Sequence, residues 1–500
     1  MTNEQRLRQL YKILSEVRSY GHAVGKLEFD IQCCAPEDGM DSAGEDMAVL
    51  GQRIHKLTHC KKYISLVEAL HADSEGLTPV QKRLVEYLYD DYCKQKNISA
   101  GFAYEWDLAM NKAYGQWLAA KKANDFSLFR DALGQLIDYT RRAIDLRDDK
   151  PATYYNACLD DYEKGNDQTQ LDAFFDALRQ RIVPLIARIQ KDGKPIRRDF
   201  MNRPCPVAQQ EAFSRYLLKL EGLRESALVL MPTEHPFTTN FGPCDVRVTT
   251  HYFEDNFISN VFSTLHEGGH ALFMQYQPKE FYDNFIDERM SNAMHECISR
   301  FYENLIGRSE AFIHFIYPKL KQISGDTFAD VSERELYEAV NIAEPSLIRT
   351  EADELTYCLH ILIRYELEKA FINGEITVDE IPALWNQKYA QYLGVQVPDD
   401  TQGCLQDVHW TSSFGYFPSY ALGSAYGVQI LRRMEMDFNV FEAVSQGELF
   451  KVRDWLIGHV FNVAAMTDPD EWIRAVTGES LNVNYYLDYL EEKFTKLYQI

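Results

Sequence analysis

Residues 257–276 read FISNVFSTLHEGGHALFMQY, and this stretch decides how the rest of the chain is interpreted. Its apolar residues recur at spacings of three, four and seven, which is typical of an amphipathic helix. On such a helix His266 and His270 stand four residues apart, so both imidazoles project from one face and can share a metal ion. Glu267 is rotated by about 100° from His266, beside the ion, where its carboxylate can act as a general base.

The His-Glu-x-x-His pattern is moderately specific, because chance would produce it only about 0.02 times in a chain of this composition. The alternative is a pair of ordinary core or surface histidines on one helix. That alternative leaves Gly268 and Gly269 unexplained, since each costs about 1 kcal/mol in a helix interior. The loss of two side chains suits the close approach of another backbone.

A zinc site of this kind needs a third protein ligand. Residues 289–307, RMSNAMHECISRFYENLIG, form a second predicted helix with its apolar residues on one face. Glu296 lies in this segment, far enough after His270 for a helix end, a loop and a new helix. Spacing alone does not choose among Glu288, Glu296 and Glu303 as the third ligand.

Helical periodicity dominates most of the chain, and Gly (26) and Pro (17) are sparse for 500 residues. Residues 245–253, DVRVTTHYF, are the one strand candidate. We expect an all-α fold: a large helical catalytic unit with a deep central cleft and at most a small β-sheet beside the metal helix. The helical segments are 4–20, 79–123, 125–146, 169–190, 208–228 and 419–500, and the predicted loops are 151–168, 191–207, 231–244 and 394–418.

The formal net charge of −23 argues against nucleic acid and anionic membranes as partners, because both carry negative charge. The first residues are charged throughout and lack the apolar centre of a signal peptide, and no run of 18 apolar residues occurs. The ten cysteines show no C-x-x-C spacing. These features favour a cytoplasmic protein with reduced thiols.

From about residue 200 to the end, five motifs in order resemble the M32 metallocarboxypeptidases, the thermostable-carboxypeptidase family. Residues 1–200 resemble it only loosely, as a helical region of suitable length. The motifs are Asp245-x-Arg247-x-Thr249, His-Glu-x-x-His at 266–270, His295-Glu296, Ile348-Arg349-x-x-Ala352-Asp353, and Gly403-x-x-Gln406-Asp407-x-His409-Trp410.

The resemblance implies that Glu296 is the third metal ligand, that Arg349 binds the C-terminal carboxylate of a peptide, and that Arg247 helps to close the cleft behind it. It also implies a homodimer, a zinc or cobalt ion, and stepwise removal of C-terminal residues. We expect one catalytic domain over residues 1–500, with a helical lobe at 1–200 and the metal and substrate motifs at 201–500.

Other polar residues have candidate roles. His409 and Tyr420 could donate hydrogen bonds to the oxyanion of a tetrahedral intermediate. Asp353, Asp407 and Glu303 are candidates for the acceptors that orient the histidine ligands. The alternative for Arg349 is an ion pair with Asp353 on one helix.

The third motif departs from the family pattern, which continues with Ser or Gly and then Gln, whereas this chain has Cys297-Ile298. The Glu ligand is kept, and Cys297 should point away from the metal into the packing. The competing functions are an oligopeptidase or dipeptide-releasing peptidase on the same scaffold, or a metal-binding helical protein without catalysis. The intact Glu267 counts against the last.

Overall fold

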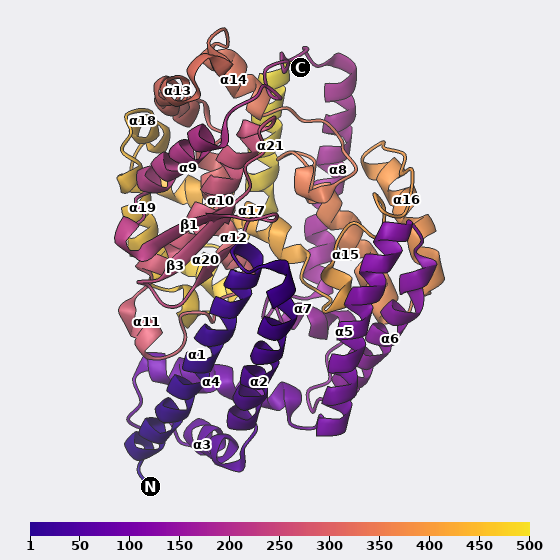
Figure 1. Ribbon diagram of the computed structural model, residues 1–500, viewed down its shortest axis with the longest axis vertical. Helices are drawn as coiled ribbons and strands as arrows, with labels where there is room; N and C mark the ends of the chain where they lie inside the picture. The colour runs from indigo at the N-terminus through magenta and orange to yellow at the C-terminus, as the bar shows by residue number, and fades with distance from the viewer.

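The computed structural model describes residues 1–500, apart from the side chains of Glu37 and Asp41. Helices account for most of the chain (Figure 1). The helices before the sheet are α1 (Asn3–Cys33), α2 (Met40–Thr58), α3 (Lys61–Ala72), α4 (Pro79–Gln95), α5 (Ala100–Ala123), α6 (Ser127–Asp145), α7 (Tyr154–Asp160), α8 (Gln168–Asp192) and α9 (Val207–Glu221).

The helices after the sheet are α10 (Phe257–Tyr276), α11 (Lys279–Asp283), α12 (Asn292–Arg300), α13 (Glu310–Ser324), α14 (Glu333–Val340), α15 (Tyr357–Asn373), α16 (Ile381–Tyr392), α17 (Pro418–Glu435), α18 (Val440–Ser445), α19 (Leu449–Leu456), α20 (Pro469–Thr477) and α21 (Val483–Tyr498). Of these helices, α10 and α12 carry the second and third motifs. A π-helical stretch, Phe301–Ile306, directly continues α12.

Three short strands lie between α9 and α10: β1 (Leu228–Pro232), β2 (Thr238–Asn240) and β3 (Val246–Thr250). Their order is β1-β3-β2, with β1 parallel and β2 antiparallel to β3. Both β2 and β3 pack against α10. The central strand β3 is nearly buried, whereas β2 is an edge strand with one paired side.

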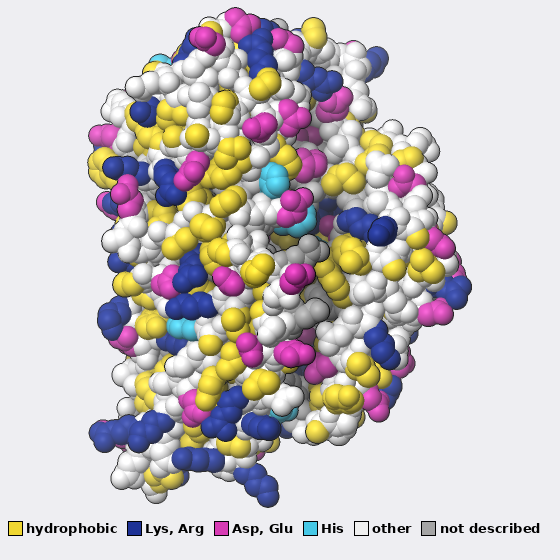
Figure 2. All heavy atoms as spheres, viewed as in Figure 1, with side chains coloured by type: hydrophobic (Ala, Val, Ile, Leu, Met, Phe, Trp, Pro, Cys, Tyr) yellow, Lys and Arg dark blue, Asp and Glu magenta, His cyan; other side chains and the backbone are white. Residues whose placement is uncertain are grey.

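A cleft separates two sides of the molecule. Figure 1 shows the sheet with α9 and α10 on one side and α5, α6 and α16 on the other, while α1 and α2 lie in front. Figure 2 shows that this face is hollowed between the two sides. The largest buried cluster runs from Phe102 to Tyr498 and includes the metal-site helices.

A second, smaller cluster, the N-terminal core, belongs mainly to α1, α3 and α4. It is completed by Phe281, Ile286 and Ala465, which come from much later in the chain. The Tyr87 hydroxyl donates to the carbonyl of Ala465 (3.0 Å), and Arg83 pairs with Asp468 (2.5 Å). The N-terminal core is therefore fastened, through α4, to residues near the far end of the sequence.

The predicted all-α class with a small sheet is confirmed, and α10 has the bounds of the quoted stretch. Several local predictions are wrong. The helical segment 79–123 is broken, because Asn97 turns to donate to the Leu146 carbonyl (2.7 Å) and Ser99 caps α5. The predicted loop 151–168 contains α7, and the predicted loop 231–244 contains the end of β1 and all of β2. Among the described residues, no helix is both long and apolar enough to cross a membrane. The division of the chain at residue 200 stays a prediction.

Candidate active site

Helices α10 and α12 bring three candidate metal ligands together. One ligand atom each of His266, His270 and Glu296 lies within 4.8 Å of the other two. The Nε2 atoms of the two imidazoles are each 4.0 Å from an oxygen of Glu296. Two imidazole nitrogens and one carboxylate oxygen at this spacing form the donor set that a catalytic zinc ion takes. The residues present therefore fit such an ion.

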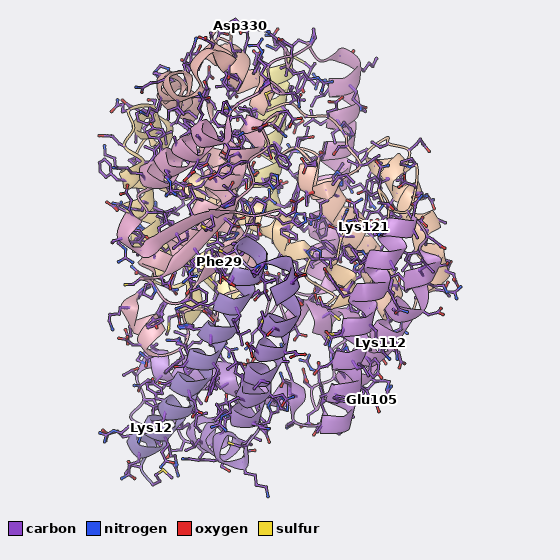
Figure 3. The ribbon with its side chains drawn as sticks, in the orientation of Figure 1. Lys12, Phe29, Glu105, Lys112, Lys121 and Asp330 are labelled. Atoms are coloured by element: carbon purple, nitrogen blue, oxygen red, sulfur yellow. The ribbon has the colours of Figure 1, made fainter. Side chains whose placement is uncertain are left out.

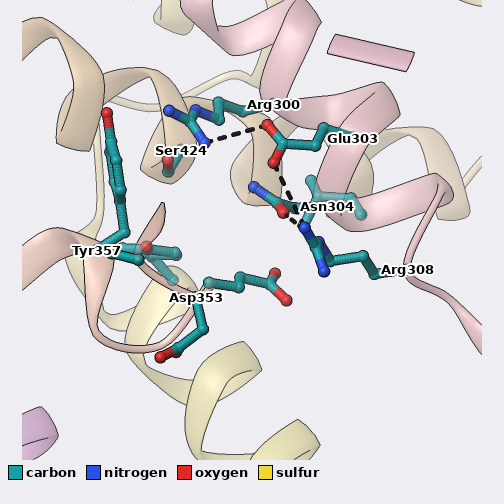
Figure 4. A pocket seen from close by; sticks show the side chains of 11 residues that line it. Arg300, Glu303, Asn304, Arg308, Asp353, Tyr357 and Ser424 are labelled. Atoms are coloured by element: carbon teal, nitrogen blue, oxygen red, sulfur yellow. Dashed lines mark hydrogen bonds and ion pairs between the residues drawn. The ribbon is translucent and has the colours of Figure 1, made fainter. Parts of the chain in front are cut away.

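Glu303 orients His266 from behind. Its Oε2 lies 2.9 Å from Nδ1 of His266, so the carboxylate accepts from Nδ1–H and leaves Nε2 free to face Glu296. Arg300 and Arg308 hold Glu303 in turn, at 3.1 and 3.7 Å (Figure 4). Burial alone would raise the pKa of Glu303, but the charges of Arg300 and Arg308 and the bond with His266 lower it to about 2. Of the three acceptors considered from sequence, Glu303 is the one that contacts a histidine ligand.

His295 supports the second histidine ligand. Its Nδ1 lies 2.6 Å from Nδ1 of His270, which leaves Nε2 of His270 on the side of Glu296. Burial lowers the pKa of His295 to about 4, and burial together with His295 lowers the pKa of His270, so both rings are neutral near pH 7 and one donates to the other. Sequence reasoning assigned His295 no role, although its place beside Glu296 in the third motif was the available signal.

Glu267, the candidate base, is buried and fixed by the edge strand. The Thr238 hydroxyl lies 2.6 Å from Oε2 of Glu267 and 3.0 Å from its backbone carbonyl. Burial raises the pKa of Glu267, while His266 and Thr238 act in the opposite direction. The carboxylate therefore stands next to the ligands with its rotamer held by β2.

Gly268 and Gly269 of α10 allow other parts of the chain to approach the helix closely on two sides. A Cβ atom at Gly269 would lie 2.7 Å from Cα of Ser299 and 2.8 Å from the Ile298 carbonyl oxygen, so α12 crosses α10 in backbone contact. Gly268 faces the buried carboxylate of Glu221. The close backbone approach expected from the sequence is confirmed at Gly269.

A buried carboxylate ties α12 to α17. Oε1 of Glu163 accepts from the backbone N–H of Ala293 and from the hydroxyl of Ser419, both at 2.7 Å. Burial raises the pKa of Glu163 to about 7. A Cβ atom at Gly423 of α17 would lie 2.7 Å from Cβ of Glu296, so the helix that carries Tyr420 rests directly on the helix that carries the third ligand candidate.

Arg349 lies in a short 3-10 turn and is almost fully buried. Its Nε and Nη2 are both 2.9 Å from Oδ1 of Asp407, and Nη1 is 3.0 Å from the Tyr357 hydroxyl. Asp353 instead accepts from backbone groups and the hydroxyl of Thr356. The alternative of an Arg349–Asp353 ion pair on one helix is therefore wrong. Asp407 also pairs with Arg364 (2.6 Å), which places it behind Arg349 and not behind a histidine ligand.

His409 and Tyr420 lie beside Arg349. Nε2 of His409 is 3.3 Å from the Tyr420 hydroxyl, and the guanidinium carbon of Arg349 is 5.0 Å from the centre of the Tyr420 ring. Burial lowers the pKa of His409 to about 4, so its imidazole is neutral at pH 7. The loop that carries His409 is anchored by the buried Glu368, which accepts from Trp410 (2.9 Å) and the N–H of Gly415 (2.8 Å).

Arg247 lies elsewhere. It pairs with Asp245 (3.0 Å) and is stacked between the rings of Phe29 and Phe241, at 4.9 and 4.8 Å. Figure 3 shows Phe29 at the end of α1 that reaches the sheet. Among the described contacts, the structure does not join Arg247 to Arg349 or to the three ligand candidates. Its contacts fasten α1 to the sheet.

The altered third motif is buried. Cys297 and Ile298 are both inaccessible to solvent, and burial strongly raises the pKa of the Cys297 thiol. Both residues belong to the main hydrophobic cluster. The prediction that Cys297 packs away from the metal is confirmed.

In this helical cleft, the helix with the HExxH motif presents two histidines to a glutamate from the helix of the next motif. This arrangement is that of a metallopeptidase of the HExxH class. Residues 9–494 match the family of carboxypeptidase Taq (M32) metallopeptidases, and the chain belongs to this family. It is thus a metallocarboxypeptidase, as the sequence motifs indicated.

Relatives of known name agree with this assignment along the whole chain. Carboxypeptidase 1 of Bacillus subtilis is 36% identical, with 98% of each chain covered. Thermostable carboxypeptidase 1 of Thermus thermophilus is 34% identical, with both chains covered completely. The crystal structure of the M32 carboxypeptidase of Deinococcus radiodurans superposes with a TM-score of 0.95 at 30% identity, covering 99% of this chain and 100% of the other.

Proposed function

We propose that this metallocarboxypeptidase holds zinc through His266, His270 and Glu296 and removes single residues from the free C-terminus of peptides. Cobalt is the alternative ion. The observation that carries the proposal is the convergence of the two Nε2 atoms on Glu296, with Glu267 held beside them by Thr238. Elemental analysis of the purified protein identifies the native metal.

When bound, zinc would lower the pKa of water and polarise the carbonyl of the last peptide bond. Glu267 is the general base that accepts the proton from the attacking water and then gives it to the leaving amine. The Thr238 hydroxyl, 2.6 Å from Oε2, holds the carboxylate in place. Glu303 and His295 fix the imidazole rings of the two histidines.

Arg349 is proposed to bind the carboxylate at the end of the peptide. Asp407 binds its Nε and Nη2, and Tyr357 binds its Nη1. A guanidinium has five N–H groups and stays charged, so a preorganised arginine still has donors for a second carboxylate. His409 and Tyr420 lie next to it and are proposed to donate to the oxyanion that forms at the cleaved bond.

The proposal is tested with one peptide in two forms, with a free and with an amidated C-terminus. The wild-type protein should shorten the free acid one residue at a time and leave the amide largely intact, as followed by mass spectrometry. Arg349→Ala should slow the free acid to the rate of the amide, because a charge-assisted pair contributes about 1.5–3 kcal/mol. Arg349→Lys, which keeps the charge but loses the fork, is the matched control and should retain part of the preference.

Two other outcomes correspond to the competing functions. Internal cuts at equal rates in both peptides would indicate an oligopeptidase, and removal of dipeptides a dipeptide-releasing enzyme. Bound metal without any cleavage would indicate a non-catalytic metal-binding protein. Each of these results would contradict the proposal.

We further propose that residues 1–500 act as one catalytic domain, that the protein forms a homodimer, and that it works in the cytoplasm. The dimer is supported by the family resemblance. The location is supported by the ten cysteines, which are all free thiols. Native mass measurement and cell fractionation test these two proposals.

A further inference from the structure

A cavity of about 240 Å³ adjoins the metal site on the side of the edge strand. Its wall includes Thr238, Met274, Glu288, Met290 and His295. Two of these residues contact the catalytic centre directly, since Thr238 bonds to Glu267 and His295 to His270. The cavity therefore lies directly beside the proposed catalytic centre.

The cavity and Arg349 are joined to the ligand set through different residues. From Glu296, the path to Arg349 runs through Arg300, 3.5 Å from the Glu296 carboxylate and 4.2 Å from the Tyr357 ring centre. Tyr357 is bonded to Arg349. The cavity is reached instead through Glu267 and His270. If Arg349 holds the C-terminal carboxylate, as proposed above, the residue before the cleaved bond lies toward the cavity.

The edge strand offers a backbone template along this wall. β2 pairs only with β3, with Thr238 opposite Val248 and Asn240 opposite Val246. The outer side of an edge strand presents unpaired N–H and C=O groups, to which an extended peptide can add as a further strand. A substrate bound in this way would direct alternate side chains into the cavity wall.

The cavity wall combines a carboxylate with apolar surface, which suits a long cationic side chain. Among the residues that the structure describes, no lysine, arginine or histidine pairs with the carboxylate of Glu288 within 4.0 Å, and Arg18 and Arg289 act on it only from farther away. The neighbouring Asp287, by contrast, is paired with Arg18 (2.6 Å). Met274 and Met290 supply flexible apolar surface, and lysine and arginine bury their aliphatic stems against such surface while the charged end reaches a carboxylate.

We infer that this cavity is the subsite for the residue immediately before the cleaved bond, and that Glu288 makes it favour lysine or arginine there. The inference rests on the proposed carboxypeptidase function. It assigns Glu288 a role in specificity, which is different from the role of third metal ligand that its position in the sequence also allowed.

Three N-acetylated peptides test the inference. They differ only in the penultimate residue, which is lysine, norleucine or glutamate, so that the tested side chain carries the only cation. The wild-type protein should show the highest kcat/KM for lysine, about 10-fold above norleucine, and the lowest for glutamate. Glu288→Gln should reduce the lysine-to-norleucine ratio to about 1 without changing the zinc content.

Glu375→Gln is the matched control, because it removes the same charge from an exposed residue outside the cavity, and it should keep the preference for lysine. Glu288→Lys should reverse the order in favour of glutamate. Equal rates for the three peptides in the wild type, or an unchanged lysine preference in Glu288→Gln, would overturn the inference. Failure of the wild type to shorten even the norleucine peptide would contradict the proposed function itself.

Discussion

The close crossing of α10 and α12 makes Gly269→Ala the sharpest test of how the metal site is built. The new methyl group would lie 2.7 Å from Cα of Ser299 and 2.8 Å from the carbonyl oxygen of Ile298. Both atoms are backbone, so no rotamer change can relieve the contact. The helices must separate instead.

The size of the effect follows from this distance. Ordinary contact begins at 3.4 Å, so α12 must move away by about 0.7 Å. Glu296 lies three residues before Ser299 on the same helix and moves with it. Metal–ligand distances tolerate only about 0.2 Å. Changes to residues that merely orient ligands already cost about 10–100-fold in metal affinity, so this displacement should weaken zinc binding by at least that factor.

Global stability should change much less. Overpacking costs typically about 1–3 kcal/mol, and replacing glycine by alanine in a helix returns about 1 kcal/mol. The assay is zinc affinity by chelator competition on the metal-free protein, together with thermal unfolding without metal. Gly115→Ala is the control, because its Cβ would meet no atom within 4 Å in the middle of α5. A folded Gly269→Ala protein with the zinc affinity of the wild type would refute the reasoning.

Two further predictions concern carboxylates. Glu267→Gln should bind zinc like the wild type but lose several orders of magnitude in kcat, because the base is removed and the ligands are kept; near-normal activity would contradict the mechanism. Folding raises the pKa of Glu163 from 4.5 to about 7, so between these pH values the folded protein keeps a proton that the unfolded chain has lost. The contribution of Glu163 to the free energy of unfolding therefore falls as the pH rises from about 4.5 to 7. Glu163→Gln cannot titrate and so avoids this loss of about 3 kcal/mol. The melting temperature of the variant minus that of the wild type should therefore be larger at pH 8 than at pH 5. A constant difference would show that Glu163 does not titrate in this range.

The metal helix was predictable from sequence because two local signals agree along it. Its apolar periodicity fixes the bounds of α10, and the i, i+4 spacing places His266 and His270 on one face. The strand β3 was predictable from its β-branched residues, whereas β1 and β2 were not. β1 joins the sheet through a parallel pairing across 18 residues of sequence distance, and β2 has only three residues (Thr238–Asn240).

The acceptors behind the ligands could not be chosen from sequence because they depend on tertiary geometry. Glu303 sits in the π-helical stretch that follows α12, and a change from α to π geometry rotates every later side chain. Asp407 and Arg349 lie 58 residues apart and meet only through the fold. The predicted ion pair of Arg349 with Asp353 was wrong because the segment is a 3-10 turn, to which the i, i+4 rule of the α-helix does not apply.

The N-terminal core has a consequence for the order in which the protein assembles during translation. Its α4 helix ends at Gln95, but Ala465 and the Asp468 partner of Arg83 are synthesised roughly 370 residues later. At about 5–20 residues per second, the first helices would spend about 20–75 seconds outside the ribosome with part of their apolar surface uncovered. We expect nascent chains stalled before residue 465 to be cut by protease within α1–α4, and released full-length chains to be protected there. The first helices to be synthesised would then be among the last to complete their packing. Chaperones that bind exposed apolar helices would therefore have the most time to bind at the N-terminus.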